Sequence, residues 1–180
     1  LGIVEMVTTQ ESEKDPYYLY VKNNVEQCCF ANGMETFVMQ YDENEGIYRS
    51  AASRELDGIL AIGQFREEQI VAIEICSSRI VFLESAPFPE KYCSVMPDYE
   101  VGIRQGVDYL IAQGHRKIVF VGPEFSTDST CQQAPELRRK FFADYMKRQG
   151  KEAEGILLDT EWQGDDVAEQ IMQYVKDFQE

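Results

Sequence analysis

Arg138 is the residue of this 180-residue chain whose type and setting best suit ligand chemistry. It precedes Phe141 and Phe142 by three and four residues, so on a helix it shares their side. Its planar guanidinium can donate hydrogen bonds to two hydroxyl groups of one sugar. The alternative is a surface arginine whose aliphatic stem covers the two rings. The pattern alone favours neither interpretation.

Two tyrosines and an aspartate are further candidates for ligand contacts. Tyr17 and Tyr18 follow Asp15-Pro16 at the start of a predicted helix. Either ring can stack on the apolar face of a sugar, or both can pack in the core or at its rim. Asp98 precedes another predicted helix, where it can cap the first turn, accept a hydrogen bond from a ligand hydroxyl, or do both.

The sequence offers no set of residues suited to catalysis. Its single histidine, His115, lies in a predicted turn at the N-terminal end of a strand, which favours a structural role. The sequence contains no G-x-S-x-G, Walker loop, G-x-G-x-x-G or metal-spaced cluster. We therefore expect no catalytic residues, no metal site and no cofactor, and we expect that the protein is not an enzyme.

Charge and cysteine content narrow the class of protein further. The net charge of −15 repels phosphate backbones, so this chain by itself is a poor binder of nucleic acid. Five cysteines, an odd number with no C-x-x-C, predict reduced and mostly buried thiols in the cytoplasm. No apolar run reaches the ~20 residues of a membrane-spanning helix, and no signal peptide precedes the first apolar run. We expect a cytoplasmic protein without membrane contact.

Predicted strands alternate with predicted helices along the chain, which indicates an α/β fold with parallel sheets. The segment 101–122 is typical: apolar residues at helical spacing end at Gly114, and a buried strand at 118–121 follows. We expect strands at 3–7, 36–40, 59–62, 80–83, 93–96, 118–121 and 155–158. We expect helices at 17–32, 47–56, 67–75, 101–113, 135–149 and from 164 onward, with a long polar loop at 124–134.

Parallel sheets of this kind bind ligands beyond the carboxyl ends of their strands, at a switch point in the strand order. This rule selects candidate residues from the predicted loops alone. They are Thr8, Thr9, the segment 15–18, the segment 63–65 with Phe65, Ser85, Asp98 and the loop after Gly122.

The sequence resembles the effector-binding domain of the lactose/galactose repressor (LacI/GalR) family, which has the periplasmic-binding-protein fold. The resemblance rests on GIV at 2–4 with DPYY at 15–18, LDGIL at 56–60, SV at 94–95 with Asp98 and Gly102, LIAQGHRKIVFVG at 110–122, and Arg138 with Phe142. The segment AIGQF at 61–65 and the pair Tyr145-Met146 are similar to the galactose-repressor-like branch.

The resemblance implies a type I fold of two Rossmann-like lobes, with residues 1–117 in the N-terminal lobe and 118–180 in an incomplete C-terminal lobe. It implies a small sugar effector between the lobes, contacted by Arg138 and, on a looser match, by Asp98 and the loop from Asp15 to Tyr18. It also implies a cytoplasmic homodimer. Operator DNA would be bound only through a helix-turn-helix domain that this chain lacks.

Three departures from the family pattern qualify the resemblance. Phe141 stands where the family usually has glycine, and Glu84 stands where an aspartate often follows the fourth strand. The chain also ends before the family's Asn-Asp segment. Two other functions remain open at this point: a sugar-binding protein of a transport system with the same fold, and an enzyme on a flavodoxin-like fold. The five cysteines and the GHRKI segment at 114–118 disfavour the transport protein.

Overall fold

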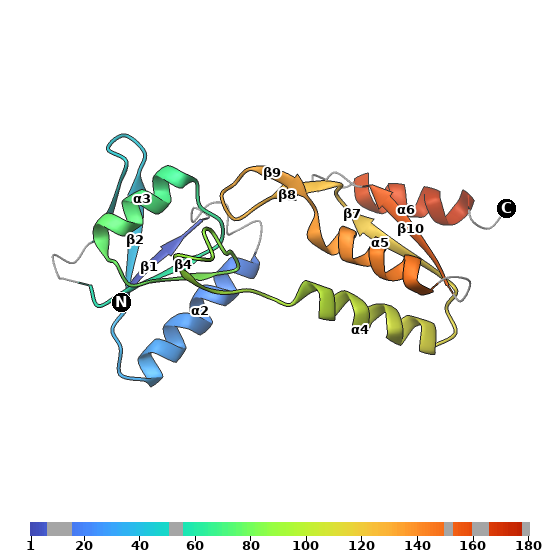
Figure 1. Ribbon diagram of the computed structural model, residues 1–180, viewed down its shortest axis with the longest axis horizontal. Helices are drawn as coiled ribbons and strands as arrows, with labels where there is room; N and C mark the ends of the chain where they lie inside the picture. Colours follow the sequence, from blue (N-terminus) through green and yellow to red (C-terminus); the bar gives the residue numbers. More distant parts are fainter. Residues whose placement is uncertain (7–15, 51–55, 150–152, 160–165, 178–180) are drawn as a thin grey trace. The chain divides into compact units, whose positions relative to one another are not determined.

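The computed structural model describes residues 1–6, 16–50, 56–149, 153–159 and 166–177, and Figure 1 shows their secondary structure. Contacts within the chain divide it into two compact units. Unit 1 comprises Leu1–Pro97 with Asp128–Gln132, and unit 2 comprises Asp98–Thr127 with Gln133–Glu180.

Unit 1 is a six-stranded sheet with helices on both faces (Figure 1). Its elements are β1 (Gly2–Glu5), α2 (Pro16–Ala31), β2 (Phe37–Asp42), β3 (Ile47–Ser50), β4 (Ile59–Ile62), α3 (Glu67–Cys76), β5 (Ile80–Leu83) and β6 (Cys93–Val95). The strand order is β3-β2-β1-β4-β5-β6, and every neighbouring pair is parallel except β2 and β3. Since the order reverses between β1 and β4, their carboxyl ends form the switch point where such sheets bind ligands.

The core of unit 1 is built from the apolar runs of its central strands. Ile3, Val4, Ile59 and Ile62 are at most 2% exposed. Fully buried Phe82 of β5 has aromatic neighbours, and the centroid of its ring lies 5.2 Å from that of Tyr92. Strands buried on both faces are expected where helices cover a parallel sheet on each side.

A tight turn at the switch point depends on glycine. Gly63 directly follows β4 with φ +100°, a conformation that L side chains rarely adopt. A Cβ atom at this position would lie 2.6 Å from the Cβ atom of Met6, just beyond β1. The ends of β1 and β4 therefore approach each other as closely as their backbones allow.

The predicted helix at 47–56 is wrong where the structure describes it. Residues Ile47–Ser50 form β3, which pairs antiparallel with β2. The turn is set by Asp42, whose carboxylate accepts hydrogen bonds from the N–H groups of Asn44 and Glu45, and by Gly46 with φ +66°. The rings of Tyr41 and Tyr48 then pack against each other across the strands in a tilted arrangement, with centroids 5.0 Å apart.

Unit 2 is a two-stranded parallel sheet packed against helices. Its elements are α4 (Tyr99–Ala112), β7 (Lys117–Gly122), β8 (Phe125–Thr127), β9 (Gln133–Pro135), α5 (Leu137–Gln149), β10 (Glu154–Asp159) and α6 (Asp166–Asp177). The core joins Val107 of α4, Ile118 of β7, and Phe142 and Met146 of α5. On α6, Met172 and Val175 are exposed.

The segment predicted as a long polar loop contains a hairpin of β8 and β9. The Asp128 carboxylate accepts hydrogen bonds from the N–H groups of Thr130 and Gln132 and holds the turn. Pro135, predicted in the first helical turn, is the last residue of β9, so α5 begins two residues later.

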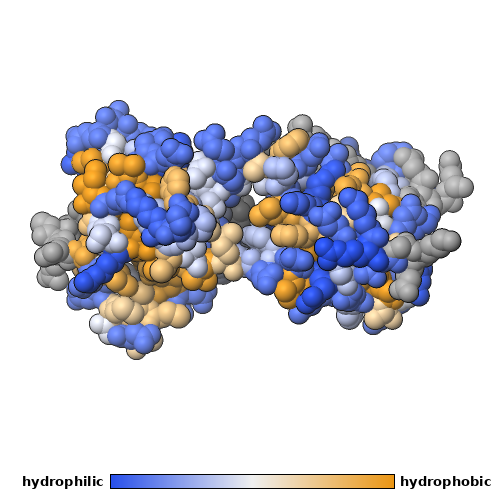
Figure 2. Space-filling view, in the orientation of Figure 1, coloured by the Kyte–Doolittle hydropathy of each residue, from blue (hydrophilic) through white to orange (hydrophobic). Residues whose placement is uncertain are grey.

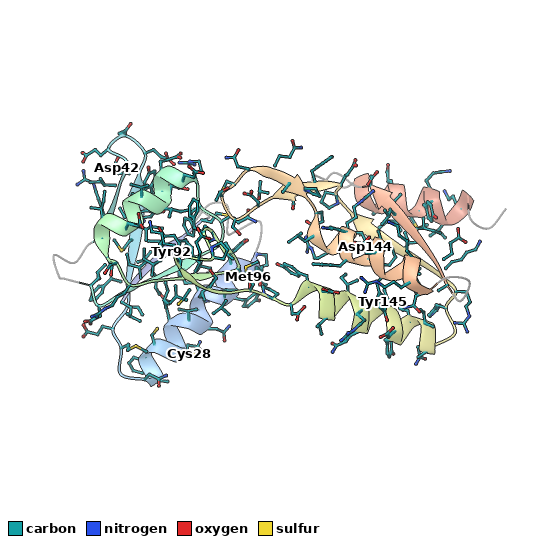
Figure 3. All side chains as sticks on the ribbon, viewed as in Figure 1. Cys28, Asp42, Tyr92, Met96, Asp144 and Tyr145 are labelled. Carbon is teal, nitrogen blue, oxygen red and sulfur yellow. The ribbon has the colours of Figure 1, made fainter. Side chains whose placement is uncertain are left out.

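Two other predictions differ from the structure. The chain divides into its units at Pro97, because α4 packs on α5, whereas the sequence predicts a lobe boundary after residue 117. The thiols are not mostly buried: Cys28 (Figure 3) and Cys93 are exposed, and only Cys29 lies in the core. Neighbouring residues on a helix point about 100° apart, so Cys29 faces the sheet while Cys28 does not.

Candidate functional site

Unit 1 carries a polar pair at the carboxyl edge of its sheet. Tyr17 lies in the first turn of α2, the helix that follows β1, and Glu84 is the first residue after β5. The Tyr17 hydroxyl donates a hydrogen bond to Glu84 Oε1 over 2.5 Å. Glu84 has φ +67°, a left-handed conformation that is uncommon for residues other than glycine and marks strain. The hydrogen bond joins the end of β5 to the start of α2.

Ser85 adds a second polar group next to Glu84. Its side chain is fully buried, and its Oγ has no hydrogen-bond partner in the part of the chain that the structure describes. Buried hydroxyl groups are rarely left in this state, since an unmade hydrogen bond is unfavourable. The next residue, Ala86, donates its N–H to Ser129 Oγ over 2.9 Å, which anchors the 128–132 turn on unit 1.

The three aromatic residues of unit 1 that are predicted to contact a ligand differ in how far they are exposed. Tyr17 is 46% exposed, and its ring meets the edge of Tyr18 with centroids 5.3 Å apart. Tyr18 is half-buried and lies against Gly63 at the switch point. Phe65 is fully buried and packs on Phe82, so it belongs to the core beneath the sheet edge and offers no exposed surface to a ligand.

Unit 2 carries a second polar cluster around Arg138, which lies in the first turn of α5. Arg138 Nε donates a hydrogen bond to Glu136 Oε1 over 2.5 Å, and the guanidinium carbon lies 5.8 Å from the centroid of the Tyr99 ring. Tyr99 begins α4, so the cluster joins the starts of two helices. The Arg138 side chain is 44% exposed, which is compatible with both roles predicted for it, a ligand contact and a surface arginine whose stem covers the rings.

Glu136 is unusual for a carboxylate because only 6% of its side chain is exposed. Burial by itself raises the pKa of Glu136, but hydrogen bonds from the side chain and backbone of Arg138 outweigh it. The pKa of the carboxyl therefore lies below its usual value, and Glu136 is charged at neutral pH. A charged pair in this position places one fixed anion beside the arginine.

Asp98 caps α4, which confirms one of the two roles predicted for it, that of capping the first turn. Its Oδ1 accepts a hydrogen bond from the N–H of Val101 over 2.9 Å. A contact with a ligand hydroxyl stays a prediction for Asp98. Thr8 and Asp15, the remaining predicted ligand residues, lie outside the residues that the structure describes.

Arg139, the next residue of α5, has a side chain that is only 15% exposed and that forms an ion pair with Asp159 at the end of β10. Its Nη1 also lies 3.5 Å from the carbonyl oxygen of Gly122 at the end of β7. Arg139 thus ties together the carboxyl ends of both strands beside the Arg138 cluster.

Three residues of these two polar clusters are not among the predicted ligand residues: Glu84, Tyr99 and Glu136. Glu84 follows a strand, and the edge rule that selected Ser85 applies to it equally. Tyr99 and Glu136 are neighbours of Asp98 and Arg138 in the sequence, but nothing in the sequence predicts that a glutamate is buried there.

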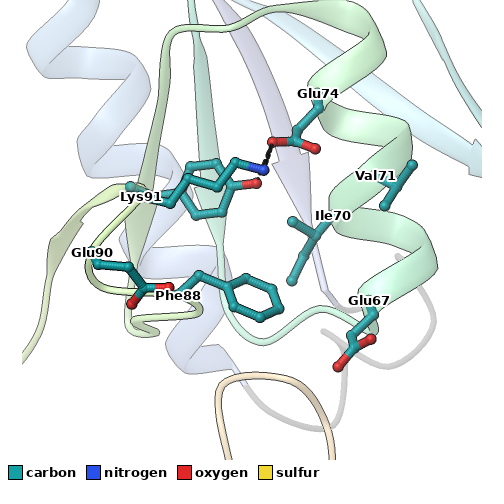
Figure 4. A pocket seen from close by; sticks show the side chains of 8 residues that line it. Glu67, Ile70, Val71, Glu74, Phe88, Glu90 and Lys91 are labelled. Atoms are coloured by element: carbon teal, nitrogen blue, oxygen red, sulfur yellow. Dashed lines mark hydrogen bonds and ion pairs between the residues drawn. The ribbon is translucent and has the colours of Figure 1, made fainter.

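A groove lies elsewhere on unit 1, between α3 and the segment 88–92 (Figure 4). Its volume of about 210 Å³ is below the range typical of small-molecule sites. Its carboxylate Glu74 accepts hydrogen bonds from Tyr92 and Lys91, which lowers the pKa of Glu74. None of the predicted ligand residues lines this groove, so we do not assign it to the same site.

No helix among the described residues is long and apolar enough to cross a bilayer.

Comparison with known proteins decides the family of the chain. The family model for periplasmic binding proteins and the sugar-binding domain of the LacI family matches residues 4–174. The chain belongs to this family. The resemblance inferred from the sequence motifs is thereby confirmed.

Curated relatives of this LacI-family chain are transcriptional regulators. The repressor MelR of Bacillus subtilis (strain 168) is 26% identical over 139 residues, which cover 77% of this chain and 39% of MelR. The regulator GanR of the same organism is 27% identical over 147 residues, which cover 82% of this chain and 43% of GanR. GalR of Streptococcus thermophilus is 27% identical over 131 residues. The chain therefore spans about two-fifths of the length of the relatives it matches.

Solved LacI-family structures share the fold. A regulator from Lactobacillus casei with bound TRIS superposes with a TM-score of 0.52 at 18% identity, covering 87% of this chain and 56% of that chain. A structure of a regulator from the same organism with bound sucrose gives a TM-score of 0.52, covering 87% of this chain and 57% of that chain. The predicted α/β fold of the periplasmic-binding-protein type is confirmed.

Proposed function

We propose that this chain is the effector-binding region of a LacI/GalR-type transcriptional regulator that binds a small sugar and changes the operator affinity of a homodimer in response. The observation that carries the proposal is the family match over residues 4–174, together with relatives that are all HTH-type regulators. These relatives favour a regulator over the transport protein and the enzyme that the sequence left open.

Two polar clusters support a sugar as the effector. In unit 2, Arg138 presents a planar donor next to a charged carboxylate and an aromatic ring. In unit 1, Tyr17, Glu84 and the Ser85 hydroxyl, which has no partner among the described residues, supply donors and acceptors at the carboxyl edge of the sheet. Sugars need this combination of hydrogen-bonding groups and aromatic surface.

The homodimer is supported by apolar residues on the surface of unit 1. Leu19, Tyr20 and Phe30 of α2 are 41%, 66% and 85% exposed, and Met34 and Val38 follow in the sequence with about 40% each. Figure 2 shows hydrophobic residues at the surface of the same unit. Exposed apolar patches of this kind mark protein interfaces.

The net charge bears on how operator DNA is bound, and the free thiols bear on the cellular compartment. The net charge of −15 opposes DNA contact by this chain, so we propose that a helix-turn-helix domain outside it binds the operator. All five cysteines are free thiols, which fits a reducing compartment, and we propose a cytoplasmic protein.

The test is a thermal shift of the complete protein against galactose, lactose, melibiose and sucrose. A sugar at about 100 times its Kd adds roughly 2.7 kcal/mol of stability, or several degrees in Tm. We expect the shift with at least one sugar, its loss in Arg138→Ala, and its retention in Arg148→Ala, a control on the exposed part of the same helix. Operator binding measured with and without that sugar completes the test.

Two results would contradict the proposal. Saturating sugar that leaves operator affinity unchanged would reject a sugar-controlled regulator. A shift that survives in Arg138→Ala as fully as in Arg148→Ala would remove Arg138 from the binding site and leave it a surface residue.

A further inference from the structure

The buried carboxylate of Glu136 is tied to Arg138 at two points. Its Oε1 accepts hydrogen bonds from Arg138 Nε over 2.5 Å and from the Arg138 backbone N–H over 3.2 Å. Ser126 of β8 adds a side-chain hydrogen bond to the same carboxylate. Glu136 is therefore held by the hairpin on one side and by the start of α5 on the other.

The same contacts restrict the Arg138 guanidinium. The bond at Nε fixes the edge of the guanidinium nearest the stem, and the Tyr99 ring lies 5.8 Å from its central carbon. With Nε committed to Glu136, a ligand can be met only through the terminal nitrogens Nη1 and Nη2. These two atoms form the end of the fork, which suits two neighbouring hydroxyl groups.

We propose that Glu136 is a positioning residue for effector binding, which sets the plane of the Arg138 guanidinium before the ligand arrives. The proposal rests on the proposed function, since it assigns a role within the same site. A long arginine side chain loses rotamer freedom when it binds, and a fixed neighbour removes that loss from the binding step. Glu136 thereby raises affinity without touching the ligand.

The burial of Glu136 separates this arrangement from a surface ion pair. Exposed ion pairs stabilise little, because both side chains remain mobile and water screens their charges. Only 6% of the Glu136 side chain is exposed, and the hydrogen bonds from Arg138 and Ser126 satisfy it. A buried carboxylate with several donors keeps one orientation, and so does the guanidinium bonded to it.

The experiment is a double-mutant cycle on sugar affinity, measured by calorimetry on the complete protein with the sugar that gives the largest thermal shift in the panel above. Glu136→Gln keeps the shape of the side chain and removes its charge. We expect it to weaken binding about tenfold in the natural background and less than twofold in the Arg138→Ala background. Glu124→Gln, an exposed carboxylate just before β8, is the matched control and should change affinity less than twofold.

A second measurement needs no ligand. The NMR signal of the Arg138 Nε–H group should exchange slowly with water in the natural protein and at least tenfold faster in Glu136→Gln. Equal losses of affinity in both arginine backgrounds, or unchanged exchange at Nε, would overturn the positioning role. If no sugar of the panel binds the natural protein, the proposed function fails on that panel while the exchange measurement still decides the role of Glu136.

Discussion

Substitution of Gly63 by alanine tests the close approach of β1 and β4 at the switch point. Gly63 has φ +100°, and its new Cβ atom would lie 2.6 Å from the Cβ atom of Met6, which real Cβ atoms essentially never show. Met6 cannot yield by rotating its side chain, because its Cβ atom is attached to the backbone. Either the ends of the two strands move apart or the turn changes its conformation.

The magnitude follows from two contributions. Holding a non-glycine residue in a sparsely populated backbone region costs about 1–3 kcal/mol. Forcing packed atoms apart typically costs about 1–3 kcal/mol more. Replacing glycine also restricts the unfolded chain, which stabilises the folded state by about 0.4–1 kcal/mol. We therefore expect Gly63→Ala to lower the free energy of unfolding by roughly 3 kcal/mol.

Gly33→Ala is the matched control in the same unit. Gly33 follows α2 with φ +71°, and a Cβ atom there would meet nothing within 4 Å. Gly33 lies near the left-handed helical region, where alanine is less strained than at φ +100°, and it shares the effect on the unfolded chain, so we expect a loss of about 1 kcal/mol or less. The difference of roughly 2 kcal/mol between the two variants combines the contact with Met6 and the greater backbone strain at Gly63.

The assay is urea unfolding of the complete protein followed by far-UV circular dichroism. With a slope of about 2 kcal/mol per molar urea, the two midpoints should differ by about 1 M. If Gly63→Ala unfolds at the same urea concentration as Gly33→Ala, the ends of β1 and β4 can move apart at no measurable cost in stability. The close approach of these two strands would then not constrain the switch point of the sheet.

Three further outcomes follow from individual side chains. Phe82→Ala should lower the free energy of unfolding by about 3–5 kcal/mol, because the ring is fully buried, and urea unfolding against the exposed-site control Val71→Ala checks this. Cys28 should react with a thiol reagent at least tenfold faster than Cys29, since only Cys29 is in the core; equal rates would contradict the orientation of α2. The lowered pKa of Glu136 gives stability that is present above about pH 4.3 and lost as the pH falls through the folded-state pKa. Arg138→Met removes the guanidinium hydrogen bond and charge but keeps burial and the hydrogen bonds from the backbone N–H of residue 138 and from Ser126. The pKa of Glu136 should therefore lie above that of the natural protein, the stability should be lost at a higher pH as the pH falls, and a carboxyl NMR titration checks the direction.

The sequence determined the elements whose signal is local. The runs at 59–62 and 80–83 are apolar without interruption and end at turn residues, so β4 and β5 lie where the sequence predicts them. The edge rule also places Tyr17 and Ser85 at the carboxyl ends of strands. Family membership followed from motifs spread over the chain, and the match over residues 4–174 confirms it.

The tertiary structure decided what depends on partners far apart in the sequence. Tyr17 and Glu84 are separated by 67 positions, and only the pairing of β1 with β4 and of β4 with β5 brings them together. The strand β3 was missed because its stability comes from the turn at Gly46 and from pairing with β2, which a short apolar run does not reveal. Glu136 is the strongest case, since a glutamate is expected in water. Its burial results from packing between the hairpin and α5, and that packing is what places a fixed charge beside Arg138.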